Sequence, residues 1–294
     1  MELAIHNWMR AESLETTLAR ISKLGYENIE IQGSPEIYEA KEVKQLLHHY
    51  GVKCYGSVTL MLEKRNLIAK DPYQRADSVQ YVKDIIDLVK ALDGKMVSIV
   101  PSTVGKIIPD ARPELEWDWA VESMKELYAY AEPLGIKLGI EPINRFETYF
   151  INRGDQALAL AEATGPNCGV VLDVFHMNLE ESDVFAAFRR AQHRLINVHV
   201  ADNNRMAPGM GHFDWPKIIS TLNEIKYDNV LSVEFCAPLD RTPANPFPNS
   251  IDENPAGMTA EQKKFLEDHG SAAMTEEFYF MLTKKSAESL RPLI

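Results

Sequence analysis

Four residues of metal-binding type lie in short apolar segments in the second half of the sequence. They are Glu141 in LGIEP, Asp173 in VVLDVF, His199 in NVHVAD and Glu234 in LSVEF. A carboxylate buried among apolar side chains costs several kcal/mol unless it is paired or bound to a metal. Three such carboxylates that converge with one imidazole would repel one another, and a divalent cation between them removes the repulsion. We therefore predict that one divalent metal is held by these four side chains.

The donor set narrows the choice of metal. Three carboxylates with one imidazole nitrogen suit Mn²⁺, Mg²⁺ or Co²⁺, and Zn²⁺ also accepts such ligands. The three cysteines, Cys54, Cys168 and Cys236, lie far apart and form neither a CxxC zinc motif nor a disulfide framework. Taken singly, each acid is equally typical of a helix N-cap, and a lone histidine is typical of a core. The prediction therefore depends on the four residues coming together.

Further polar residues follow the four at short spacing. Glu147 lies six residues after Glu141, His176 three after Asp173, and Arg205 six after His199. Side chains of these types suit a polyol ligand, although helix caps, loop salt bridges and solvent exposure account for each one equally well. His212, in the segment PGMGHFDW, lies in a glycine-containing turn of the same region.

The elements that position these residues alternate between short apolar strands and amphipathic helices. A first helix is predicted between an N-cap at Ser13 and Gly25, with Leu14, Leu18 and Ile21 on one face. Strands are predicted at 3–8, 28–33, 52–60, 95–102, 136–144, 168–178, 194–204 and 229–235. The later helices are predicted at about 36–50, 73–92, 117–133, 154–164, 181–191, 214–226 and 275–288.

Strict strand–helix alternation predicts parallel strands, in either an open doubly wound sheet or a closed barrel. Eight units in 294 residues fit a single (β/α)₈ TIM barrel over 1–294. The open sheet is less favoured because the turn after the first strand, NWMRAES, contains no glycine for a dinucleotide site. In such a barrel the carboxyl ends of the strands face the mouth, which places the four ligand-type residues there, at the ends of strands five to eight.

One segment interrupts the alternation. Residues 237–259 contain five prolines and are predicted to form a loop after the eighth strand. On that face of a barrel, a long loop either covers a substrate, contacts a neighbouring subunit or is a flexible insertion.

Composition restricts the partners. The formal net charge of −12, from 43 acidic and 31 basic residues, disfavours a nucleic-acid ligand. No run approaches the roughly 18 consecutive apolar residues of a membrane helix, and the beginning MELAIHNWMRAE lacks the basic region of a signal peptide. We therefore expect no membrane partner and a cytoplasmic protein.

Several motifs resemble the ketose 3-epimerase (D-tagatose/D-psicose 3-epimerase) family of the xylose-isomerase-like sugar phosphate isomerase/epimerase TIM barrels. The resemblance is strong over 136–235, weaker but collinear over the first 130 residues, and it lapses in the proline-rich loop. The motifs are EPINRFETYF (141–150), LDVFHMNLEE (172–181), NVHVADNNRMAPGMGHFDW (197–215) and SVEF (232–235).

The resemblance implies a metal-dependent isomerase that epimerises a free ketose at C3 through a cis-enediolate. It implies that the four ligand-type residues hold the metal, usually Mn²⁺ or Co²⁺, and that Glu141 and Glu234 act as acid and base on opposite faces of the reacting carbon. It also implies that Glu147, His176 and Arg205 bind the sugar, with His176 and Arg205 donating to the oxygen on which charge develops. Relatives of this kind are homo-oligomers, so a dimer or tetramer is expected.

Three stretches depart from the family pattern: GSVTLM (56–61), the segment after the fourth strand, and the long extension after the eighth. They would change the substrate pocket and spare the metal centre, so alternatives on the same scaffold stay open. One is a lyase that cleaves 3-oxo-C-glycosides together with a small partner subunit. Others are a ketose–aldose or hydroxypyruvate-type isomerase and a non-catalytic sugar-binding barrel. An endonuclease IV-like enzyme is disfavoured because its multi-zinc site needs more histidines.

Overall fold

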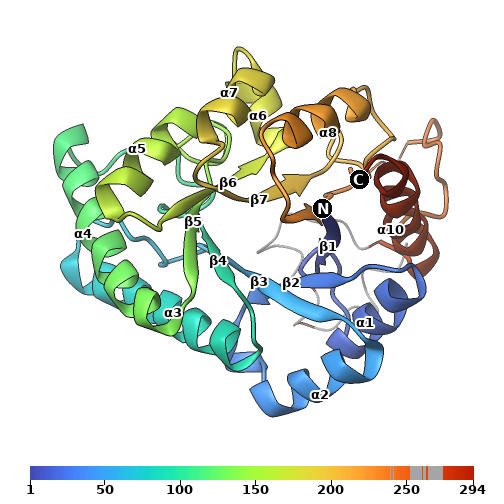
Figure 1. The fold of residues 1–294 in the computed structure, drawn as a ribbon, viewed down its shortest axis with the longest axis horizontal. Coiled ribbons are helices and arrows are strands. Elements are labelled where there is room, and N and C mark those ends of the chain that lie inside the picture. The colour runs from blue at the N-terminus through green and yellow to red at the C-terminus, as the bar shows by residue number, and fades with distance from the viewer. Residues whose placement is uncertain (239, 241, 252–259, 261–262, 264–273) are drawn as a thin grey trace.

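The computed structural model describes residues 1–238, 240, 242–251, 260, 263 and 274–294. Eight parallel strands close into a barrel in the order of the chain, and β1 pairs with both β2 and β8 (Figure 1). The strands are β1 (Glu2–His6), β2 (Asn28–Gly33), β3 (Lys53–Thr59), β4 (Met96–Ile99), β5 (Lys137–Ile140), β6 (Gly169–Asp173), β7 (Leu195–Val200) and β8 (Val230–Val233). The predicted (β/α)₈ barrel is confirmed.

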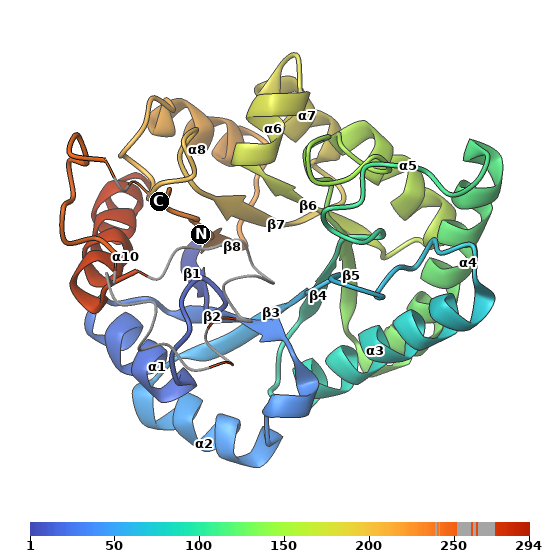
Figure 2. The same ribbon diagram turned by 180° about the vertical axis from the view of Figure 1, so that it is seen from behind.

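Helices surround the barrel on all sides (Figures 1 and 2). They are α1 (Leu14–Lys23), α2 (Ala40–Tyr50), α3 (Pro72–Ala91), α4 (Pro113–Ala131), α5 (Gly154–Thr164), α6 (Val174–Glu180), α7 (Val184–Ala191), α8 (Trp215–Glu224) and α10 (Glu276–Leu290). Short 3₁₀ turns are η1 (Pro35–Ile37), η2 (Glu132–Leu134) and η4 (Arg291–Leu293). None of the helices in the described part of the chain combines the length and apolar character needed to cross a bilayer.

Some predicted boundaries are wrong. The strand predicted over 168–178 ends at Asp173, because the Asp173 side chain accepts a hydrogen bond from the amide of Phe175 (2.8 Å) and caps α6. The helix predicted over 181–191 is α7, which begins at Val184 after the N-cap Asp183. The N-cap at Ser13 is confirmed, and Gly25 adopts the left-handed conformation that ends the first helical unit. Of the predicted loop 237–259, positions 239, 241 and 252–259 lie outside the described residues.

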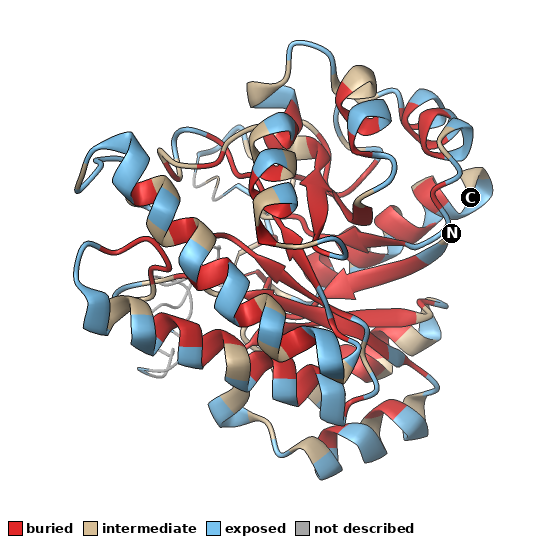
Figure 3. Cartoon of the chain, turned by 60° about the vertical axis from the view of Figure 1, so that its left-hand side comes forward, coloured by how far each residue is buried: buried red, intermediate tan, exposed pale blue. Residues whose placement is uncertain are grey.

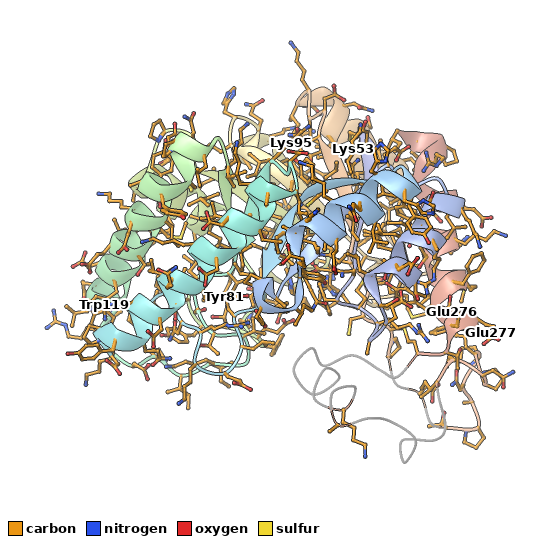
Figure 4. The ribbon with its side chains drawn as sticks, turned by 90° about the horizontal axis from the view of Figure 1, so that it is seen from below. Lys53, Tyr81, Lys95, Trp119, Glu276 and Glu277 are labelled. Carbon is orange, nitrogen blue, oxygen red and sulfur yellow. The ribbon has the colours of Figure 1, made fainter. Side chains whose placement is uncertain are left out.

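The core has two parts. The helices bury their inner faces against the outside of the barrel (Figure 3). Inside the barrel, six buried side chains close the end at which the strands begin, where Figure 4 shows Lys53 and Lys95. The six are Ala4, Tyr55, Met96, Val171, Ile196 and Val230. The polar residues at the other end therefore rest on an apolar floor.

An ion-pair cluster joins the first helix to the last. Arg20 on α1 contacts both carboxylate oxygens of Glu12 (2.5 and 2.6 Å) and Glu276 at the start of α10 (2.7 Å), and its guanidinium lies 4.6 Å from the ring centre of Tyr279. Figure 4 labels Glu276 at the end of the molecule away from Lys53. The cluster connects α1 with α10, the two helices on either side of the pairing between β1 and β8.

We predict that Glu12→Gln lowers the free energy of unfolding by about 3–5 kcal/mol at neutral pH, because it leaves the buried Arg20 without its main partner. Burial raises the pKa of Glu12, but the hydrogen bonds and charge of Arg20 outweigh it and lower that pKa below 4.5. The carboxylate therefore stabilises the fold above its unfolded pKa, and this stability is lost as pH falls through the folded pKa.

Urea unfolding of wild type and Glu12→Gln at pH 7 and roughly pH 3 measures this difference. The exposed Glu15→Gln, three residues further on in α1, is the matched control and should change little. An equal difference between wild type and Glu12→Gln at both pH values would contradict the assignment.

Candidate active site

The four predicted ligand-type residues meet at the mouth of the barrel. Glu141 follows β5, Asp173 ends β6, His199 lies in β7 and Glu234 follows β8. All four are buried, and one ligand atom from each lies within 4.8 Å of the others. Metal–ligand distances of about 2.0–2.2 Å place neighbouring ligand atoms roughly 3–4.4 Å apart. The four side chains therefore offer a donor set that suits a divalent cation.

Glu141 and Glu234 each have one oxygen that accepts a hydrogen bond from a residue outside the ligand set. Ser98 donates to Glu141 Oε2 (2.8 Å), and the indole of Trp8 donates to Glu234 Oε1 (3.2 Å). The other oxygens, Glu141 Oε1 and Glu234 Oε2, lie 2.9 and 3.4 Å from His199 Nδ1. The two carboxylates thus approach the same imidazole nitrogen, each with one oxygen turned to the centre.

Arg205 also reaches this centre. Its guanidinium contacts Asp173 Oδ2 and Glu234 Oε2 (the latter at 3.1 Å), and it lies 4.6 Å from the ring centre of Phe175. Burial lowers the pKa of Arg205, but the negative charges of Asp173 and Glu234 outweigh this effect and raise that pKa. The guanidinium therefore stays positive. The structure therefore places a fixed positive charge beside two of the acids.

One buried carboxylate organises the loop that carries Arg205. Asp202 accepts hydrogen bonds from the amides of Asn203 (2.9 Å), Gly209 (2.8 Å) and Phe213 (3.2 Å) and from the indole of Trp215 (3.0 Å). Within this loop the Arg205 backbone is held at a φ of 60°. His212, singled out from the sequence, is in the same loop but is exposed, and its side chain does not line the mouth.

His176 and Glu147 are brought to the mouth as predicted, and Asn144 connects them. The Asn144 amide donates to His176 Nδ1 (3.3 Å), and its side-chain nitrogen donates to Glu147 Oε1 (2.6 Å). Because Nδ1 accepts, the neutral imidazole carries its proton on Nε2, which lies 3.6 Å from Asp173 Oδ2. His176 thus presents an N–H toward the centre.

A cavity of about 120 Å³ opens above the carboxylates. Its charged and imidazole lining residues are Glu141, Glu147, His176, Arg205 and Glu234. Its apolar lining includes Val58, Leu60, Met61, Leu62, Val100 and Val104. Val58 lies in β3, and the other five apolar residues lie in the segments that follow β3 and β4.

Several residues of this site are not predicted from the sequence: His6, Trp8, Glu30 and Ser98. His6 and Glu30 are fully buried inside the barrel, and Glu30 Oε1 lies 3.4 Å from His199 Nε2. Burial raises the pKa of Glu30, but the charges of His6 and His199 outweigh it and hold that pKa at about 2. An acid in the strand NIEIQG, between two isoleucines, was the signal that could have identified it.

The chain matches the xylose isomerase-like TIM barrel family over residues 18–269. It belongs to that family. A D-psicose 3-epimerase from Ruminiclostridium cellulolyticum is 30% identical over 227 residues, covering 74% of this chain and 76% of the relative. An L-ribulose 3-epimerase from Methylomonas sp. is 29% identical over 227 residues, covering 76% and 79%. The predicted membership of the ketose 3-epimerases is confirmed.

Solved structures have the same fold. A D-psicose 3-epimerase from Clostridium cellulolyticum, crystallised with D-tagatose, superposes with a TM-score of 0.81 at 24% identity, covering 100% of this chain and 99% of the other. A D-allulose 3-epimerase from Methylomonas sp., in complex with D-allulose, has a TM-score of 0.83 at 22% identity, covering 100% and 97%. The barrel architecture of this chain is therefore that of proteins solved with ketose ligands.

We predict that metal binding releases about one proton at neutral pH. Burial lowers the pKa of His199, but Glu141, Glu30 and Glu234 outweigh it and raise that pKa well above 6.5 in the metal-free protein. A metal that binds Nδ1 must displace this proton, so the apparent affinity falls by up to about tenfold for each pH unit below the raised pKa.

Titration calorimetry with Mn²⁺ in two buffers of different ionisation enthalpy counts the protons released. A metal affinity that is constant between pH 6 and roughly pH 8 would contradict the protonated His199.

Proposed function

We propose that this protein is a metal-dependent ketose 3-epimerase that inverts the C3 centre of a free ketose through a cis-enediolate. The observation that carries the proposal is the approach of two carboxylates, Glu141 and Glu234, to one His199 nitrogen at the barrel mouth. The relatives named D-psicose, L-ribulose and ketose 3-epimerase support the same reaction class.

A bound divalent cation supplies the electrophile that polarises the ketose carbonyl and stabilises the enediolate. Glu141, Asp173, His199 and Glu234 would hold it, with Mn²⁺ the first expectation and Co²⁺, Mg²⁺ or Zn²⁺ compatible with the same donors. Their burial limits competition from water, and their positions in or directly after strands of the closed barrel keep the donor set together.

The two glutamates are the proposed acid–base pair. Ser98 and Trp8 each occupy one oxygen of a different glutamate, which leaves Glu141 Oε1 and Glu234 Oε2 directed to the centre. Inversion at C3 requires one carboxylate to take the proton from one face and another group to return a proton from the opposite face. Glu141 follows β5 and Glu234 follows β8, and we propose that they act on opposite faces of C3.

The remaining polar residues would position the sugar. His176 Nε2–H and the Arg205 guanidinium are donors for the oxygen on which negative charge develops, and Arg205 also sets the charge environment of Glu234. Glu147, held by Asn144 and partly exposed, is an acceptor for a sugar hydroxyl. The comparisons support epimerisation over the lyase and ketose–aldose alternatives.

The assembly and location complete the proposal. We expect a homodimer or homotetramer in the cytoplasm. Exposed Ile107, Ile108 and Phe146 lie on neighbouring loops at the mouth, joined by a bridge between Lys106 and Thr148, and such an apolar patch supports self-association. Light scattering after size-exclusion chromatography determines the oligomeric state.

We predict that the metal-loaded protein exchanges the C3 hydrogen of a free ketohexose with D₂O and inverts that centre. Glu234→Gln should lower kcat by at least about 10²–10⁴-fold, because one of the two proton-transfer groups is lost. NMR of the sugar follows both the label and the epimer, and circular dichroism verifies that the variant folds.

Glu224→Gln on the exposed face of α8 is the matched control and should keep wild-type activity. Near-normal turnover by Glu234→Gln would refute the two-carboxylate mechanism. If wild type exchanged no free ketose but released an aglycone from a 3-oxo-C-glycoside, the lyase alternative would replace the proposal.

A further inference from the structure

One further buried acid, Glu30 of β2, lies deeper in the barrel than the proposed metal centre. We propose that Glu30 is a positioning residue that accepts the Nε2–H of His199 and thereby presents Nδ1 of His199 to the metal. This inference rests on the proposed function, since it assigns a role to a residue that supports the same centre without touching the sugar.

The two nitrogens of His199 face different groups. Nδ1 lies 2.9 Å from Glu141 and 3.4 Å from Glu234, whereas Nε2 lies 3.4 Å from Glu30 Oε1. A neutral imidazole has one donor and one acceptor nitrogen, so a metal on Nδ1 requires the proton on Nε2. Glu30 is the carboxylate toward which that proton points, an arrangement that orients a metal-bound histidine and makes it a stronger donor.

Glu30 is itself held for this role. The side chain of Asn197 donates to Glu30 Oε2 (2.6 Å), and Asn197 Oδ1 accepts from the Val198 amide (2.8 Å) and from Ser232 (3.2 Å). Glu30 Oε1 and His199 Nε2 have no hydrogen-bond partner among the described residues, although both are fully buried and face each other. A small movement of either side chain would convert the 3.4 Å contact into the charge-assisted bond of about 2.8 Å that satisfies both atoms.

His6 restricts the alternatives for the His199 ring. The two imidazoles pack edge to face with centres 4.6 Å apart. His6 Nε2 lies 3.7 Å from Glu30 Oε2 and 3.8 Å from Glu234 Oε1. A ring confined in this way, with Glu30 on one side and Glu141 on the other, cannot easily turn over to exchange its two nitrogens.

The test is the metal affinity of Glu30→Gln, measured by calorimetry with Mn²⁺ and by competition with a chelator. Removing an outer carboxylate of this kind lowers metal affinity by about 10–100-fold, so we expect that loss. Glu12→Gln, outside the site, is the control for general destabilisation and should keep the wild-type affinity. A Glu30→Gln affinity within about twofold of wild type would overturn the proposal.

A second measurement needs no variant. Nitrogen-15 NMR of wild-type protein loaded with diamagnetic Zn²⁺ should show His199 protonated at Nε2 and bound through Nδ1. An Nδ1-protonated His199, or a metal on Nε2, would overturn the proposal even if Glu30→Gln failed to fold. The outcomes also separate the two hypotheses. If the wild-type protein neither bound metal nor exchanged the C3 hydrogen, the proposed function would be refuted. If wild type did both and Glu30→Gln kept the wild-type metal affinity, only the role of Glu30 would be refuted.

Discussion

Mutual repulsion among buried carboxylates is the constraint on which this structure depends. Glu141, Asp173 and Glu234 are gathered at the mouth of the barrel, where little water is available to screen them. His199 and Arg205 compensate part of their charge, and a divalent cation would compensate the rest. The parallel strands of the barrel hold these acids together. The packing of the strands against the surrounding helices provides the stability that the acids themselves do not.

The register of the barrel determines which side chains meet. Asp173 pairs with His199 between β6 and β7, and His199 pairs with Ser232 of β8, which lies two residues before the ligand Glu234. Because alternate residues of a strand face the same side, Asn197 lies one level below His199 and reaches Glu30 from the opposite part of the barrel. The support that Asn197 and Glu30 give to His199 therefore comes from deeper in the barrel than its mouth.

The fold and the four ligand-type residues could be predicted because each leaves a local signal. Strand–helix alternation indicates the barrel, and acids in apolar strand ends indicate the mouth. Glu30 leaves a similar local signal, an acid in an apolar strand, whereas His6, Trp8 and Ser98 leave none, since their roles depend on contacts across the closed barrel between residues far apart in the sequence. The end of β6 was also mispredicted, because the capping of α6 by Asp173 competes with continuation of the strand. The donor set alone does not select one metal.

The bond between Arg20 and Glu276 joins positions 256 residues apart, and Trp8 and Glu234 are 226 residues apart. Neither contact can form before the last part of the chain is synthesised. The preceding strand–helix units, in contrast, pack against units that are close to them in sequence. During synthesis on the ribosome, the nascent chain would thus form an open, curved sheet before β8 could pair with β1 and close the barrel. The acid contributed after β8 would arrive at that closing step, so a truncated translation product would lack the complete metal-binding set.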